Sequence, residues 1–141
     1  MNIYAESSAV AAWLLKEQRG PEIGSILTAA THVVTSDLTI IECDRAILRA
    51  NAEGRMTSTV TTSVSSDLTS AAAKWDVLAL LPAIVARARQ PFPLEPIRSL
   101  DALHVSWALH MRVAIPELAM LSLDDRVRRV SEAVGLPLLP A

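Results

Sequence analysis

The stretch THVVTSDLTIIECDRAILRANAEG, from Thr31 to Gly54, places a predicted strand directly before a predicted helix. Residues 31–35 are mostly β-branched, which favours a buried strand. Ser36 or Asp37 can cap the helix that follows, and that helix is expected to run to about residue 53, where Gly54 ends it. A strand that passes at once into a helix is typical of an α/β fold.

The same alternation continues in both directions along the chain. Strands are predicted at residues 2–5, 31–35, 77–81, 119–123 and 136–139, and helices at 8–16, 21–30, 37–53, 56–74, 82–89, 99–112 and 125–134. This order indicates a central, mainly parallel sheet covered by helices on both faces, and therefore a three-layer α/β/α fold. The length of 141 residues suits a single domain over residues 1–141.

The composition predicts a protein of the reducing cytoplasm. Cys43 is the only cysteine, so neither an internal disulfide nor a cysteine-based zinc site is expected. The longest apolar stretch, residues 77–86, is interrupted by Pro82 and is about half the length that a membrane span needs. The first six residues contain no basic side chain, which argues against a secretory signal. We therefore expect no membrane association.

Four acidic residues occur in apolar surroundings where a solvated side chain is unexpected. Three of them follow or closely follow predicted strands, and the fourth lies near the start of a predicted helix. They are Glu6, Glu42, Asp124 and Asp101. In parallel α/β folds the carboxyl ends of the strands share one edge, where ligands bind. Because a buried carboxylate is costly unless it is paired or binds a metal, these residues are predicted to form a metal site.

The predicted cation is Mg²⁺ or Mn²⁺, since hard divalent cations prefer oxygen ligands. We expect Glu6, Asp101 and Asp124 to lie closest to the metal, and Glu42 to reach it through a water molecule. Asp125 is an alternative to Asp124 as the fourth acid. All four acids are candidate catalytic residues, because such a metal activates water for attack on a phosphodiester.

Each acid also has a structural alternative, in which its charge serves a helix end or a surface ion pair. The alternatives are a helix cap for Glu6, a pair with Arg98 for Asp101, pairs with Arg45 or Arg49 for Glu42, and a capping box of Ser122 and Asp125 beside Asp124. Ser8 is expected either to hydrogen-bond Glu6 or to cap a helix. His104 lies three residues after Asp101 and so shares its helix face, where it is expected to support the site or to pack.

The charge balance permits an RNA partner without arguing for one. The formal net charge is −2, with 13 basic residues against 15 acidic ones. Four of those acids belong to the candidate site, so the rest of the chain is slightly basic. Several arginines are candidates for contacts to RNA phosphates, although each also suits an ordinary surface position: Arg45, Arg49, Arg87, Arg89 and Arg98.

Four sequence blocks, in order, resemble the PIN-domain ribonuclease family, and in particular its VapC-like toxins of type II toxin–antitoxin systems. They are IYAESSAV (residues 3–10), VTSDLTIIE (34–42), SLDALH (99–104) and LDDRV (123–127), followed by GLP at 135–137. The blocks match the family's IYLDTSAL, VTSxLTxxE, xLDALH and YDxRL, and the resemblance covers essentially the whole chain. It implies a PIN-like α/β/α fold with acids clustered around Mg²⁺ or Mn²⁺.

The resemblance also implies an endoribonuclease that acts on RNA, commonly as a homodimer, and that a cognate antitoxin neutralises. One position departs from the family, whose first acid is usually aspartate where this chain has Glu6. Since a misplacement of about 1 Å can cost on the order of 100-fold in rate, the alternative is a weakened PIN domain that binds RNA or protein. A second alternative is a nuclease that processes rRNA or tRNA without an antitoxin.

Overall fold

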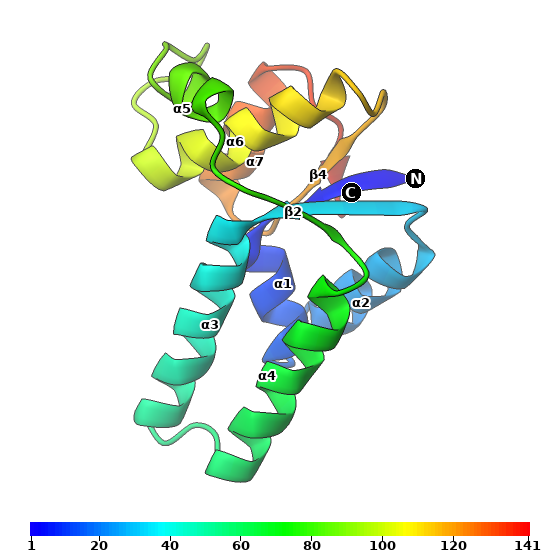
Figure 1. Ribbon diagram of the computed structural model, residues 1–141, viewed down its shortest axis with the longest axis vertical. Helices are drawn as coiled ribbons and strands as arrows, with labels where there is room; N and C mark the ends of the chain where they lie inside the picture. The colour runs from blue at the N-terminus through cyan, green and yellow to red at the C-terminus, as the bar shows by residue number, and fades with distance from the viewer.

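The computed structural model describes residues 1–141, which form a five-stranded sheet flanked by seven helices (Figure 1). The strands are β1 (Asn2–Ala5), β2 (His32–Ser36), β3 (Asp76–Leu78), β4 (Ala119–Leu121) and β5 (Leu138–Leu139). Their order across the sheet is β3-β2-β1-β4-β5, and every neighbouring pair is parallel. Ile3 at the centre of the sheet pairs with Val33 on one side and Ala119 on the other.

The seven helices cover the two faces of the sheet. They are α1 (Ser7–Leu14), α2 (Gly20–Ala29), α3 (Asp37–Ala52), α4 (Ser58–Ala72), α5 (Pro82–Ala88), α6 (Ser99–Arg112) and α7 (Asp125–Ala133). In Figure 1, α5, α6 and α7 lie above the sheet and α1 to α4 below it. The predicted three-layer α/β/α, PIN-like architecture with a parallel sheet is confirmed.

The central strand β1 divides the core into two halves. Successive side chains of a strand point to opposite faces. Ile3 and Ala5 accordingly pack in the cluster beneath α1 and α3, whereas Tyr4 packs in the cluster beneath α6 and α7. All three residues are fully buried. Because both faces of β1 are covered, its carboxyl end is held firmly where Glu6 begins.

The predicted strand at 77–81 is wrong over its second half. Only Asp76 to Leu78 pair with β2, after which the chain leaves the sheet. The carbonyl of Ala79 accepts a hydrogen bond of 3.1 Å from the indole nitrogen of Trp107 on α6 instead of a strand partner. Pro82 then begins α5. The other predicted elements are present, with ends displaced by at most a few residues.

The Ser- and Thr-rich segment that was predicted to be a helix is the helix α4. Thr57 caps it, because its hydroxyl accepts from the backbone N–H of Val60 at 3.2 Å. Val64 and Leu68, one turn apart, are its buried residues and join the core below the sheet. None of the helices is long and apolar enough to span a bilayer.

Candidate functional site

Glu6 is the first residue after β1 and is almost fully buried, with 4% of its surface exposed. Its carboxylate accepts hydrogen bonds from three serine hydroxyls. Ser7 donates to Oε1 at 2.7 Å, Ser122 donates to Oε2 at 2.7 Å, and Ser8 also donates to Oε2. No lysine or arginine pairs with Glu6, and its nearest basic group is Nε2 of His104 at 3.8 Å. A buried carboxylate is therefore held in place by neutral donors, with little compensation of its charge.

Glu42, in the second turn of α3, is held by two donors from other elements. Its Oε1 accepts from the Ser7 hydroxyl at 3.1 Å and lies 2.6 Å from Nε2 of His104. The His104 side chain is 1% exposed, and its Nδ1 lies 2.9 Å from the hydroxyl of Tyr4. Tyr4 in turn donates to the Ser36 hydroxyl at 2.9 Å. Burial raises the pKa of the Tyr4 phenol far above its usual range, so this residue stays neutral.

Asp101 and Asp124 come from the starts of α6 and α7. Burial raises the pKa of the Asp101 carboxyl, and the negative charges of Asp124 and Glu6 raise it further, while Arg126 and His104 act in the opposite direction. One oxygen of Asp124 caps α7 by accepting from the backbone N–H groups of Arg126 at 2.8 Å and Val127 at 3.3 Å. The other oxygen has no hydrogen-bond partner within the protein.

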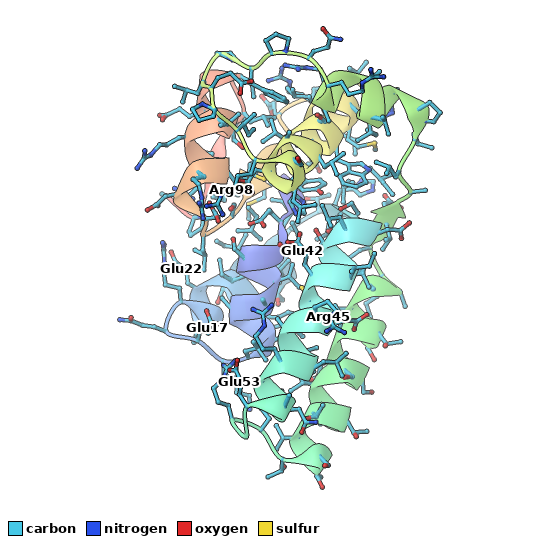
Figure 2. The ribbon with its side chains drawn as sticks, turned by 90° about the vertical axis from the view of Figure 1, so that its left-hand side faces the viewer. Glu17, Glu22, Glu42, Arg45, Glu53 and Arg98 are labelled. Carbon is cyan, nitrogen blue, oxygen red and sulfur yellow. The ribbon has the colours of Figure 1, made fainter.

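All four predicted acids line one cavity of about 310 Å³, together with Ser7, Ser8, Arg45 and Arg49. Figure 2 shows Glu42 and Arg45 on α3, facing the side from which the cavity opens. The tightest group of potential metal ligands is Glu6, Glu42 and His104, whose ligand atoms lie within 4.8 Å of one another. Asp101 and Asp124 are outside that group, so the structure places Glu42 nearer to Glu6 than the sequence suggested.

The donor set of this cavity fits a hard divalent cation. Carboxylate oxygens are the ligands that Mg²⁺ and Mn²⁺ prefer, and their combined negative charge has few partners here. The only arginine close to any of the four is Arg126, 3.9 Å from Asp124 and more than half exposed. A bound cation would compensate charges that the protein leaves unpaired.

The structural alternatives for the four acids are wrong. The side chain of Glu6 makes no capping hydrogen bond to α1, although the residue occupies the cap position. Glu42 forms no ion pair with Arg45 or Arg49, and Asp101 forms none with Arg98. The predicted capping box of Ser122 and Asp125 is absent. Asp124 itself caps α7, and Ser122 contacts Glu6 and the backbone N–H of Asp124.

Two predicted supporting roles are confirmed. Ser8 hydrogen-bonds Glu6, and it also accepts from the backbone N–H groups of Leu123 and Asp124 at 2.9 and 3.1 Å. His104 supports the site through Glu42. The sequence did not point to Ser122, and the signal that could have found it is the strand order. Because β4 lies beside β1 with Ala5 opposite Leu121, the residues that follow each strand are neighbours.

Comparison with known proteins yields similarity in sequence and in fold. No family model matches the chain. The chain is 27% identical to Ribonuclease VapC35 of Mycobacterium tuberculosis, from strain CDC 1551 and from strain H37Rv, over 136 residues that cover 95% of this chain and 93% of the relative. The crystal structure of PAE2754 from Pyrobaculum aerophilum superposes with a TM-score of 0.61 at 16% identity and covers 98% of this chain and 83% of that one. The structural likeness shows a shared fold.

Proposed function

We propose that this protein is a metal-dependent endoribonuclease of the cytoplasm and the toxin of a toxin–antitoxin pair. The observation that carries the proposal is the cavity in which Glu6, Glu42, Asp101 and Asp124 converge, with Glu6 buried and unpaired by any lysine or arginine. Similarity to a VapC ribonuclease over nearly the whole chain supports the same activity and an RNA substrate.

The chain's own residues would hold and orient the reacting groups. Glu6, Asp101 and Asp124 would hold Mg²⁺ or Mn²⁺, and Glu42 would act on a water molecule beside it. When bound, the cation supplies water activation and charge neutralisation on the phosphodiester. The serine hydroxyls fix the two oxygens of Glu6, and His104 fixes one oxygen of Glu42. Such fixed donors reduce the reorganisation that the reaction requires.

A cleavage assay tests the activity directly. The purified protein should cut single-stranded RNA with Mg²⁺ or Mn²⁺ and should not cut it with EDTA. Asp101→Asn, which removes one charge at nearly constant size, should largely abolish Mn²⁺ binding in calorimetry. Persistence of cleavage in EDTA would exclude the metal, and unchanged Mn²⁺ binding in the variant would remove Asp101 from the metal site.

The proposal includes two protein partners, a second copy of the chain in a homodimer and a cognate antitoxin. Exposed apolar side chains on α3 and α4 support a covered surface, since Ile41, Leu48 and Val60 are 56%, 50% and 46% exposed. Light scattering should show a dimer at micromolar concentration, or a complex when an antitoxin is co-expressed. A strict monomer that recovers no partner from cells would contradict this part.

The alternative is a weakened domain that binds RNA or protein without cutting it. The observation that favours it is Glu6, whose longer side chain is already held by three serine hydroxyls. This alternative predicts RNA binding with no metal-dependent cleavage by the parent chain, which the assay above distinguishes.

A further inference from the structure

A second cavity adjoins the acidic one and has a different character. It has a volume of about 430 Å³ and lies between α7, the first turn of α6 and the segment that precedes α6. Asp101 lines both cavities, so the two meet at that residue. The other residues of the second cavity are basic or apolar, apart from Glu95, whose carboxylate is engaged by the backbone N–H groups of Phe92 and Ile97 at 2.9 and 3.0 Å.

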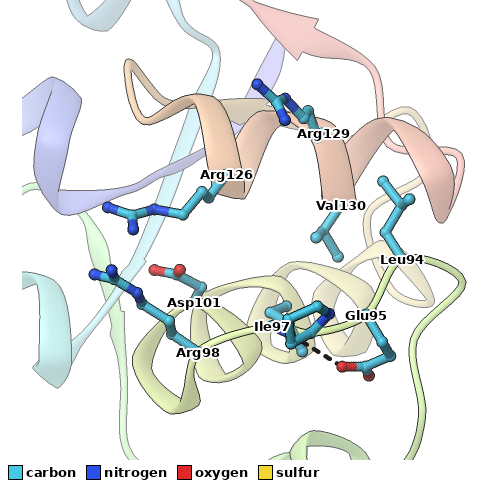
Figure 3. Close-up of a pocket in the computed structure, with 9 residues that line it drawn as sticks. Leu94, Glu95, Ile97, Arg98, Asp101, Arg126, Arg129 and Val130 are labelled. Atoms are coloured by element: carbon cyan, nitrogen blue, oxygen red, sulfur yellow. Dashed lines mark hydrogen bonds between the residues drawn. The ribbon is translucent and has the colours of Figure 1, made fainter.

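Two arginines stand at the end of this cavity nearest the acids. Figure 3 shows Arg98 and Arg126 reaching toward the same side, with the carboxylate of Asp101 between their guanidinium groups. Neither arginine forms an ion pair with Asp101, and Arg98 makes no side-chain hydrogen bond at all. The only charged group near Arg126 is Asp124, at 3.9 Å. Their donors are therefore free for a ligand.

Other arginines in the same region are used differently. Arg128 donates to the carbonyls of Ser122, Leu139 and Pro140, and Arg112 donates to two carbonyls at the end of α7. Those two side chains hold the chain together and leave few donors spare. The contrast identifies Arg98 and Arg126 as cations that the fold does not require at their positions.

The far end of the cavity is apolar. Leu94, Ile97 and Val130 line it, and Figure 3 shows Val130 on α7 facing the loop that carries Leu94 and Ile97. Leu94 is 45% exposed even though it lies in a hollow. A cavity with a cationic end and an apolar end suits a ligand with an anionic end and a flat, weakly polar end. Its volume is within the range of small-ligand sites.

We propose that this cavity binds the nucleotide next to the scissile phosphodiester of a single-stranded RNA, with Arg98 and Arg126 on its phosphate and the apolar wall against its base. The inference rests on the proposed ribonuclease activity and adds the path of the strand. Arginine forms paired hydrogen bonds with phosphate, and apolar side chains tolerate any base. Arg45 and Arg49, in the acidic cavity, would receive the strand on the other side of the acids.

Binding in EDTA tests the inference without any cleavage. The probe is a fluorescently labelled RNA of 12 nucleotides and mixed sequence, and anisotropy is measured over a series of salt concentrations. The variants are Arg98→Ala, Arg126→Ala and the double variant. The control is Arg55→Ala, which loses the same charge from an exposed arginine paired with Glu53 at the end of α3.

We expect each single variant to bind RNA about 3- to 10-fold more weakly than the control does. The slope of log K against log salt should fall by about 0.7 for each phosphate contact that is lost from a single strand. Arg98→Lys keeps the charge and should restore most of the slope, which separates a lost contact from a folding defect. Leu94→Ala should weaken binding with the slope unchanged, because it removes apolar contact alone.

The result that overturns the inference is equal RNA affinity and equal salt slope in the double variant and in Arg55→Ala. Cleavage by the parent chain is measured separately with Mn²⁺. A chain that binds RNA through Arg98 and Arg126 but cuts none supports the nucleotide site and overturns the nuclease. A chain that cuts RNA while the double variant binds like the control overturns the nucleotide site alone.

Discussion

The imidazole Nε2 of His104 lies 2.6 Å from Oε1 of Glu42, although the two residues are on different helices, α6 and α3. A carboxylate only accepts hydrogen bonds, so Nε2 carries the hydrogen and donates it. Tyr4 holds the opposite ring nitrogen at 2.9 Å. The imidazole is therefore fixed from both sides, and it fixes Glu42 in turn.

Replacing His104 should affect both stability and activity. His104→Phe keeps a buried ring but leaves Glu42 and the Tyr4 hydroxyl without this partner. We expect the free energy of unfolding in urea to fall by about 1–3 kcal/mol. RNA cleavage should fall by about 10- to 100-fold, as is typical for residues that orient groups around a metal.

Tyr4→Phe is the matched control, because it removes only the outer hydrogen bond of the chain. It should lower stability by about 1 kcal/mol and change cleavage much less than His104→Phe does. Equal cleavage by His104→Phe and the parent protein would show that Glu42 needs no support from the imidazole.

Changing Glu6 separates the effect of its charge from that of its length. Glu6→Gln keeps the size of the side chain but removes an anionic ligand, so cleavage should drop by about 100-fold or more. Glu6→Asp restores the residue that PIN domains usually carry and should keep or raise cleavage. Because Ser7, Ser8 and Ser122 contact the longer side chain, Glu6→Asp should also lose about 1 kcal/mol of stability.

Cleavage rates and melting temperatures of both Glu6 variants decide this prediction. If Glu6→Gln cuts RNA as fast as the parent protein, Glu6 has no part in the reaction. If Glu6→Asp melts at the parent's temperature, the serine hydrogen bonds contribute little to stability.

Cys43 should be inert in the folded protein. It is fully buried, and burial together with the charges of Glu6, Glu42 and Asp44 raises the pKa of its thiol to about 12. Since the thiolate is the reactive form, iodoacetamide at pH 8.5 should label Cys43 only after unfolding, followed by mass spectrometry. Rapid labelling of the folded chain would contradict the burial.

The same shift has a consequence for stability at high pH. Below the pKa of the unfolded thiol, near 8.5, the thiol is neutral in both states and contributes no pH dependence. Above it the unfolded state ionises first, so stability should fall by about 1.4 kcal/mol per pH unit until the folded thiol also titrates. Cys43→Ala should lack this component, which a comparison of the two urea curves at pH 8 and pH 10 would reveal.

Local patterns predicted most of the fold because neighbouring residues determine it. The strand and cap at residues 31–37 and the helix from Ser99 to Arg112 depend on side chains within a few positions of one another. The end of β3 was wrong since it depends on a distant residue. Trp107 takes the carbonyl of Ala79, which a strand partner would otherwise have used.

The site divides in the same way. The four acids stood out because each lies in apolar sequence, and the cavity does bring them together. Their partners did not stand out: Ser122 is 116 positions from Glu6, and His104 is 62 positions from Glu42. Those contacts follow from the order of strands in the sheet and from the packing of α6 over it, which no local pattern encodes.

Asp124 and Asp125 are adjacent acids whose roles can be separated by substitution. Asp124 caps α7 with one oxygen and lines the acidic cavity, whereas Asp125 is exposed in the first turn of the helix. Asparagine caps helices about as well as aspartate does, so Asp124→Asn should retain the melting temperature while losing the charge. We expect its RNA cleavage to fall by about 100-fold.

Two further variants complete this test. Asp124→Ala removes both the charge and the cap, so it should lose the same activity and also about 1 kcal/mol of stability. Asp125→Asn removes an equal charge one residue away and should cut RNA like the parent protein. If Asp125→Asn is the inactive variant and Asp124→Asn is active, Asp124 serves the helix alone and the fourth acid of the site is Asp125.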